Sequence, residues 1–244
     1  MSKSVNYLSD EGLRIDGRKP EEIRRTICRL GIFEQADGSA YIELGNTRVL
    51  AAVYGPHEVR GGGKTRANHE RALINCQYSM ATFSTSERKR RPRGDYRSLE
   101  ITNSMKQVFE TAILVHLLPY TQIDIFVEVL QSDGSNYSAC VNAASLALVH
   151  AGIPLKDIVC ASTAGIINET AILDVNHTEE GLPSCPVMTI AILPETKQVL
   201  SLESSGRLNL DSLDKLMESA IKGCMDVHKE LKSAVISYSS RASE

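Results

Sequence analysis

The chain has 244 residues, and its apolar fraction of 42%, with 16 Gly and 8 Pro, is typical of a folded globular protein. No apolar run approaches the roughly 20 residues that span a bilayer, and the first residues lack the apolar core of a signal peptide, so we expect neither a membrane partner nor secretion. The net charge of −3 conceals an asymmetry, because residues 1–122 carry 19 Lys and Arg against 14 Asp and Glu, whereas residues 123–244 carry 8 against 16. A basic half beside an acidic half predicts binding to a polyanion or to an acidic partner.

The first half of the chain predicts a β-rich unit that ends in a helix. Residues 24–31 alternate like a strand, and residues 33–56 resemble three short strands joined at Asp37-Gly38 and Gly45-Asn46. Gly55-Pro56 is expected to end this meander, and residues 71–83 predict a further strand. Residues 99–118 place apolar side chains at helical spacing, which predicts an amphipathic helix packed on a sheet.

The second half repeats this order. Residues 121–130 predict a strand, Asp133-Gly134 a tight turn, and residues 138–149 a helix. Strands are then predicted at 157–164, 167–173, 187–193 and 198–203, before a long helix over 211–237 with Asp211 as its N-cap. Strands followed by a helix, twice over, predict an internal duplication. We therefore expect an α+β fold in a single domain, residues 1–244, with repeat halves of about 1–120 and 121–244.

The six cysteines are scattered, without any Cys-x-x-Cys pair. This spacing argues against a zinc site and predicts reduced thiols in the cytosol or the nucleus. The residues are Cys28, Cys76, Cys140, Cys160, Cys185 and Cys224.

The turn at Asp133-Gly134 is a candidate anion site. A helix that begins at such a turn aims free backbone N–H groups outward, and its dipole favours a negative charge there. An ordinary strand-turn-helix has the same spacing, so this pattern alone leaves both interpretations open.

The densest positive charge lies just before the predicted helix of the first half. Arginine forks match phosphate geometry in a bidentate way, which lysine does not, so this run predicts contact with nucleic acid. A solvated loop is the alternative interpretation. The cations are Arg88, Lys89, Arg90, Arg91, Arg93 and Arg97.

Short motifs of one known family occur in order along nearly the whole chain. They are Gly12-Leu13-Arg14-Ile15-Asp16-Gly17-Arg18, Ala36-Asp37-Gly38-Ser39-Ala40, Gly45-Asn46-Thr47, Val53-Tyr54-Gly55-Pro56, Phe83-Ser84-Thr85, Gln131-Ser132-Asp133-Gly134, Asn142-Ala143-Ala144-Ser145-Leu146-Ala147-Leu148 and Ala151-Gly152-Ile153-Pro154. Together they resemble the RNase PH family, and within it the ring subunits of the RNA exosome. Each motif is weak alone, but the combination is specific.

The resemblance implies duplicated β-sheet-plus-helix units, the RNase PH (ribosomal protein S5 domain 2-like) fold. It implies a heterodimer with a sister RNase PH-like subunit, and a hexameric ring with cap subunits and an associated nuclease. Single-stranded RNA would be threaded through the ring for 3′-to-5′ processing and degradation, including rRNA maturation and mRNA turnover. The expected locations are the nucleus, the nucleolus and the cytoplasm.

Family enzymes degrade RNA by phosphorolysis, so the resemblance also implies a phosphate turn and catalytic carboxylates. The matching turn is Gly134, Ser135, Asn136 and Tyr137, in which Asn136 replaces a hydroxyl residue and Tyr137 replaces an arginine. The matching carboxylates are Asp174 and Glu180.

Without the arginine, one charged phosphate ligand is missing, and losing such a donor commonly costs about 10²–10³ in rate. We therefore expect a subunit that has lost phosphorolysis, with Asp174 and Glu180 vestigial. It would hold no resident cofactor or metal, and would use inorganic phosphate and Mg²⁺ only if active. In the segment that contacts RNA, where the family often has adjacent arginines, this chain has Tyr96 and Arg97.

Three alternatives stay open. The chain is an active phosphate-dependent exoribonuclease if Arg93 or a neighbouring chain replaces the missing cation. It is a free-standing RNase PH that trims tRNA ends, although the extended basic loop argues against this. From another class, it is an assembly scaffold whose basic loop binds an acidic protein rather than RNA.

Overall fold

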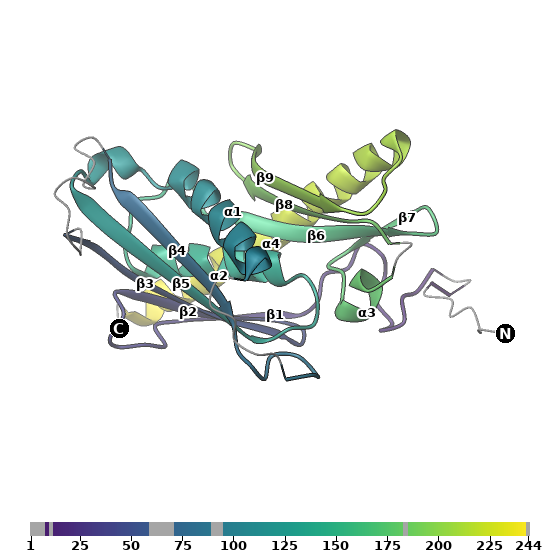
Figure 1. The fold of residues 1–244 in the computed structure, drawn as a ribbon, viewed down its shortest axis with the longest axis horizontal. Coiled ribbons are helices and arrows are strands. Elements are labelled where there is room, and N and C mark those ends of the chain that lie inside the picture. Colours follow the sequence, from purple (N-terminus) through teal and green to yellow (C-terminus); the bar gives the residue numbers. More distant parts are fainter. Residues whose placement is uncertain (1–7, 10–11, 59–70, 89–94, 183–184, 243–244) are drawn as a thin grey trace.

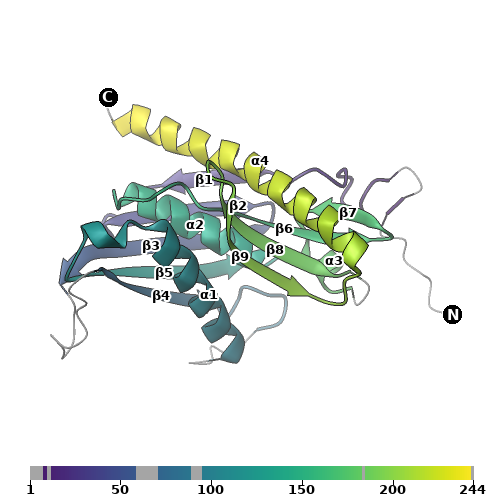
Figure 2. The same cartoon turned by 90° about the horizontal axis from the view of Figure 1, so that it is seen from above.

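The computed structural model describes residues 8–9, 12–58, 71–88, 95–182 and 185–242. In this part of the chain the strands form two sheets, and the α+β fold class predicted from the sequence is confirmed. Figures 1 and 2 show the sheets lying end to end, with helices packed along them. None of the helices in the described residues is long and apolar enough to cross a membrane.

The first sheet has the strand order β1-β2-β3-β5-β4. All its pairs are antiparallel except β4 with β5, which are parallel. Its strands are β1 (Thr26–Leu30), β2 (Gly38–Leu44), β3 (Thr47–Glu58), β4 (Leu73–Met80) and β5 (Thr121–Gln131). Along β2, β3 and β5 buried side chains alternate with more exposed ones, so one face lies in the core and the other faces outward.

The second sheet is antiparallel, with the strand order β7-β6-β8-β9. Its strands are β6 (Cys160–Ile167), β7 (Thr170–Leu173), β8 (Val187–Leu193) and β9 (Gln198–Ser205). Every residue of β6 is buried, because α2 and α4 both contact this strand.

The helices are α1 (Tyr96–Ala112), the short 3₁₀ helix η1 (Val115–Leu117), α2 (Asn136–His150), α3 (His177–Glu180) and α4 (Leu210–Ala242). Residues 137–148 of α2 are all buried, as expected for a helix that is apolar on every side and lies between other layers. It packs on β2 and β3 of the first sheet and on β6 of the second. Figure 2 shows α4 running along the second sheet to β1, so α4 also joins the two sheets.

Several predicted boundaries were wrong. Residues 33–56 form two strands rather than three, because the chain before Gly38 is a turn. Strand β3 continues through the cis Gly55-Pro56 bond to Glu58, with a register shift against β5 between Tyr54 and His57. Pro56 has no N–H to donate to β5, and it lies within this register shift, where regular pairing is already interrupted. The helix predicted over 99–118 begins at Tyr96 and ends at Ala112.

The predicted repeat halves divide the chain before β5, whereas the first sheet includes β5 between β3 and β4. Each sheet does pack against a long helix, α2 for the first and α4 for the second. The single domain with an internal duplication stays a prediction.

Candidate functional site

The turn between β5 and α2 can be built only with glycine at its centre. Gly134 has φ +82°, and a Cβ atom there would lie 2.5–2.7 Å from backbone atoms of Val175, Asn176 and His177. The turn is therefore in close contact with the loop that precedes α3. This contact brings together the predicted phosphate turn and the segment of predicted carboxylates, which are about 40 residues apart in the sequence.

Most polar side-chain groups of this turn form hydrogen bonds within the protein. Ser135 has φ +54° and precedes α2, and its Oγ donates to the Val175 carbonyl at 2.8 Å rather than capping the helix. The Asn136 side-chain amide donates to Ser132 Oγ at 2.8 Å, while its buried Oδ1 has no partner among the described residues. The hydroxyl of Ser135, a residue of the predicted phosphate turn, is thus already engaged within the protein.

Tyr137 lies in the core. It is 8% exposed, and its hydroxyl lies 3.4 Å from Ser201 Oγ on β9. Burial raises the pKa of Tyr137 to about 12, against an opposing contribution from the Ser201 hydrogen bond. The phenol therefore stays neutral at physiological pH, and the position where the family resemblance implies an arginine supplies no positive charge.

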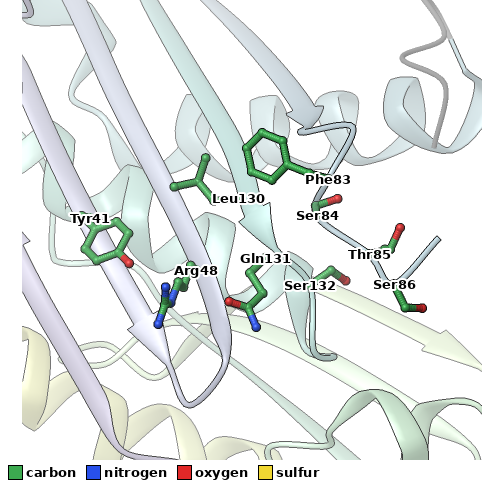
Figure 3. A pocket seen from close by; sticks show the side chains of 9 residues that line it. All are labelled: Tyr41, Arg48, Phe83, Ser84, Thr85, Ser86, Leu130, Gln131 and Ser132. Atoms are coloured by element: carbon green, nitrogen blue, oxygen red, sulfur yellow. The ribbon is translucent and has the colours of Figure 1, made fainter. Parts of the chain in front are cut away.

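An open cavity of about 500 Å³ lies beside the first residue of this turn (Figure 3). The end of β5 contributes Leu130 and Gln131, and Ser132 follows them. The facing strand contributes Arg48, which is paired in register with Gln131. The remaining lining residues are Tyr41, Phe83, Ser84, Thr85 and Ser86.

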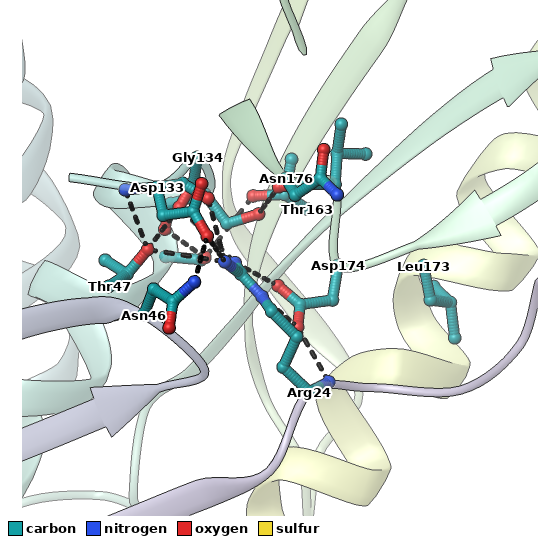
Figure 4. Close-up of polar contacts among 12 residues, drawn as sticks. Arg24, Asn46, Thr47, Asp133, Gly134, Thr163, Leu173, Asp174 and Asn176 are labelled. Atoms are coloured by element: carbon teal, nitrogen blue, oxygen red, sulfur yellow. Dashed lines mark hydrogen bonds and ion pairs between the residues drawn. The ribbon is translucent and has the colours of Figure 1, made fainter. Parts of the chain in front are cut away.

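Asp174 does not face solvent. It is 3% exposed, and its carboxylate accepts hydrogen bonds from Arg24 Nε at 2.8 Å and Arg24 Nη2 at 2.6 Å (Figure 4). The backbone N–H of Arg24 donates to the same carboxylate at 2.8 Å, and Arg18 Nη1 lies 3.5 Å from it. This pairing leaves Asp174 poorly placed for proton transfer to RNA, so its catalytic role stays a prediction that the geometry does not favour.

Arg24 joins this carboxylate to the turn. Its Nη1 donates to the Asp133 carbonyl at 2.8 Å, and its Nη2 to the Gly134 carbonyl at 3.3 Å. Burial works against the charged form, but the hydrogen bond and charge of Asp174, aided by Asp133 and Glu179, raise the pKa of Arg24 above its ordinary value. The guanidinium is thus a structural cation that faces the interior side of the turn.

The two neighbouring glutamates of α3 have different surroundings. Glu179 is 1% exposed, forms an ion pair with Arg14, and completes a capping box with Asn176. Glu180 is exposed at the end of α3 and is the predicted carboxylate that solvent reaches. Sequence reasoning missed the structural roles of Arg14 and Arg24, and no local signal indicated them, because their partners are 150 to 165 residues away.

The predicted RNA-contacting cations are described only in part. Arg88 and Arg97 are exposed, and Arg97 lies in the first turn of α1. Burial raises the pKa of Tyr78, and the negative charge of Glu180 adds to this shift whereas the positive charge of Arg97 opposes it. The other four cations lie outside the described residues: Lys89, Arg90, Arg91 and Arg93.

The described residues include no group of three or more His, Cys, Asp and Glu side chains that could hold a metal ion.

The 3′ exoribonuclease family matches the chain with its domain 1 over residues 22–154 and its domain 2 over residues 157–223. The chain therefore belongs to this family, the RNase PH family, and the predicted resemblance and RNase PH fold are confirmed.

Relatives match over almost their full length. The chain is 52% identical to the human exosome complex component RRP41 over 98% of this chain and 97% of the relative. It is 41% identical to the RRP41 homolog of Arabidopsis thaliana, with 93% of each covered, and 40% identical to Rrp41 of Thermococcus kodakarensis, with 96% and 92% covered.

Solved structures agree with this fold. Rice Rrp46 is 26% identical and superposes with a TM-score of 0.80, covering 91% of this chain and 99% of that one. A chain from the Archaeoglobus fulgidus exosome with RNA bound to the active site has a TM-score of 0.78 at 20% identity, covering 90% and 93%. At that identity the second likeness supports the fold alone.

Proposed function

We propose that this protein is an RNA-binding ring subunit of the RNA exosome that supports 3′-to-5′ RNA processing and degradation without phosphorolytic activity of its own. Ribosomal RNA maturation and mRNA turnover are the processes it would serve. The proposal draws on relatives at 40–52% identity that are exosome complex components, and on the state of the phosphate turn.

The observation that carries the loss of activity is the buried, neutral side chain of Tyr137. Phosphorolysis brings inorganic phosphate, largely a dianion near neutral pH, beside an RNA phosphate, so its site must supply positive charge. The start of α2 offers about half an elementary charge, and the nearby guanidinium of Arg24 is engaged by Asp174. Among the described residues, these groups therefore leave the turn without the charge that phosphate binding requires.

Exposed cations support the proposed binding of RNA. Arg88 and Arg97 are both exposed, and Arg97 lies in the first turn of α1. Guanidinium groups bind phosphate without regard to sequence, as threading of varied RNA requires. The remaining cations of the run extend this charge along the sequence.

The proposed partners are a sister RNase PH-like subunit, further ring and cap subunits, and an associated nuclease that performs the hydrolysis. The proposed locations are the nucleus, the nucleolus and the cytoplasm. All six cysteines are free thiols, which suits a reducing compartment. Inorganic phosphate and Mg²⁺ would act here only if the chain retained catalysis.

Phosphorolysis is tested on the full chain assembled with its sister subunit, in the presence of single-stranded RNA, magnesium and phosphate. We expect no nucleoside diphosphate above a reaction without phosphate. The control variant is Glu180→Gln, which changes the exposed carboxylate without removing a buried partner. Diphosphate release by the unmodified chain that disappears in Glu180→Gln would establish the alternative, an active exoribonuclease.

RNA contact is tested by crosslinking the assembled complex to single-stranded RNA over a range of salt concentrations. The double variant Arg88→Glu and Arg97→Glu should weaken crosslinking and flatten its salt dependence, because each lost phosphate contact lowers the slope by about one. Arg207→Glu changes an exposed arginine beyond β9 and serves as the control. Unchanged crosslinking in the double variant would favour the scaffold alternative.

A further inference from the structure

The cavity of about 500 Å³ between the end of β5 and residues 83–86 has the size of a small-molecule site. It is distinct from the predicted phosphate turn, but the two are linked, since Ser132 lines the cavity and its Oγ accepts from the Asn136 side chain. A molecule in the cavity would therefore lie next to the turn where the family resemblance implies the end of an RNA chain.

Ser84 provides the first sign of a ligand. It is 3% exposed, and its Oγ has no hydrogen-bond partner among the described residues, although it lines the cavity. Its backbone is held in place, because its N–H donates to the Ala81 carbonyl at 3.0 Å and its carbonyl accepts from Ser132 N–H at 2.9 Å. A buried hydroxyl without a partner is costly, so a polar atom of a bound molecule is the expected partner.

The apolar walls are suited to a flat ring. Phe83 is 72% exposed, which is unusual for so large an apolar side chain, and its ring lines the cavity together with Tyr41 and Leu130. Figure 3 shows Phe83 and Tyr41 on opposite sides of Leu130. Bases of single-stranded nucleic acid stack on exposed aromatic rings of this kind.

Arg48 supplies the charge. Its side chain is half exposed, and its Nε lies 3.9 Å from Glu43 Oε1, too far for a hydrogen bond. The Glu43 carboxylate instead accepts a hydrogen bond from Tyr41 Oη at 2.7 Å. The negative charge of Glu43 lowers the local potential, but the guanidinium fork can still turn to a phosphate, which it can bind through two parallel hydrogen bonds.

We propose that this cavity binds one nucleotide of single-stranded RNA, with the base on Phe83, a backbone phosphate on Arg48, and a ribose or base polar atom at the Ser84 hydroxyl. This assignment rests on the proposed RNA-binding function and adds a specific nucleotide subsite to it. The site includes only described residues, and its lining includes neither Arg88 nor Arg97.

The test measures binding of fluorescein-labelled oligo(A) to the full chain assembled with its sister subunit, by anisotropy. Phe83→Ala should weaken binding about tenfold, as the loss of one stacking ring commonly does. Arg48→Gln should weaken binding and lower the salt dependence by about one phosphate contact. The matched controls are Phe33→Ala and Arg207→Gln, which change an exposed ring in the β1–β2 connection and an exposed arginine beyond β9.

A second measurement locates the nucleotide directly. RNA that carries 4-thiouridine should crosslink to the peptide containing residues 83–86 in the wild type, and this crosslink should be lost in Phe83→Ala. Because Phe83 is largely exposed, its replacement should leave the thermal unfolding midpoint unchanged, so a folding defect would be detected separately.

The outcomes separate the two proposals. If oligo(A) binding depends on Arg97 but is unchanged in Phe83→Ala and Arg48→Gln, the nucleotide subsite is refuted and RNA binding stands. If the wild-type complex binds no RNA, both proposals fail. If the two variants prevent assembly with the sister subunit, the cavity is a protein interface, and the subsite is likewise refuted.

Discussion

Arg24 binds both carboxylate oxygens of Asp174, with Nε 2.8 Å from Oδ2 and Nη2 2.6 Å from Oδ1, inside the protein. The pair joins the segment before β1 to the residue after β7, 150 positions later in the sequence. Through further bonds to the Asp133 and Gly134 carbonyls, it also fixes the turn before α2. Asp174, which the family resemblance implied to be a catalytic residue, thus stabilises the turn through its pairing with Arg24.

Asp174→Ala should destabilise the protein by about 3–5 kcal/mol, because it leaves the buried Arg24 guanidinium without its counter-charge. Replacing both partners, Arg24→Met with Asp174→Leu, should be less damaging than either single change, since no unpaired charge remains buried. Urea unfolding of the three variants checks this order.

Asp226→Ala breaks an exposed pair with Lys229 and should cost less than about 1 kcal/mol in the same assay. An Asp174→Ala protein as stable as the wild type would contradict the structural role. If that protein also lost a diphosphate-releasing activity of the wild type, Asp174 would be catalytic after all.

Gly134→Ala tests the contact between the turn and the α3 loop. Gly152→Ala is a matched control, because Gly152 also has a left-handed φ, +70°, but an added Cβ there meets nothing within 4 Å. Gly152→Ala should cost about 1–2 kcal/mol, the price of the left-handed conformation alone. Gly134→Ala should cost clearly more, roughly 3 kcal/mol or above, because backbone atoms must also move. Equal losses in chemical unfolding would show that the turn is not tightly packed.

The sequence predicted the elements whose patterns are local. Strand β8 was predicted with its observed bounds, and α2 within two residues, because β-branched and Ala-rich runs carry their own preference. Strand β6 was predicted to begin at Asp157 but begins at Cys160. Asp157 instead accepts hydrogen bonds from the N–H groups of Ile158 and Glu195, and the second of these comes from a distant loop.

The candidate site was predictable only in part, for the same reason. The turn at Asp133-Gly134 and the exposed Arg97 follow from short motifs. The burial of Asp174 does not, because a carboxylate at the end of a strand looks the same in sequence whether it faces water or a distant arginine. Nothing in the sequence likewise distinguishes Arg14 and Arg24 from exposed arginines. The fold pairs them with Glu179 and Asp174.

Tyr137 should behave as a core residue rather than as part of a binding site. Tyr137→Phe removes a hydroxyl whose contact to Ser201 is long, at 3.4 Å, so it should change stability by less than about 1 kcal/mol. Tyr137→Ala should cost about 3–5 kcal/mol through the cavity it leaves. Thermal unfolding of both variants measures these two losses of stability. A large loss of stability in Tyr137→Phe would mean that the hydroxyl has a stronger partner than Ser201.

The last prediction concerns pH and His150, at the end of α2. Its Nδ1 accepts a hydrogen bond from Ser39 N–H at 3.1 Å, so in the neutral ring Nε2 carries the hydrogen and donates to Tyr238 Oη at 2.8 Å. Burial lowers the pKa of His150 below its ordinary 6.5. As pH falls through 6.5, the unfolded chain therefore takes up this proton before the folded chain does, and the stability that His150 contributes decreases.

His150→Gln should accordingly destabilise the protein more at pH 7.5 than at pH 5.5, when urea unfolding is measured at both values. The other histidines and the carboxylates are present in both proteins, so their titration largely cancels in the difference between wild type and variant. Gln198→Ala removes an exposed side chain that does not titrate and should show the same effect on stability at both pH values. A His150→Gln effect that is constant, or that grows as pH falls, would show that the ring is protonated in the folded protein, with Nδ1 as a donor and without its bond to Ser39.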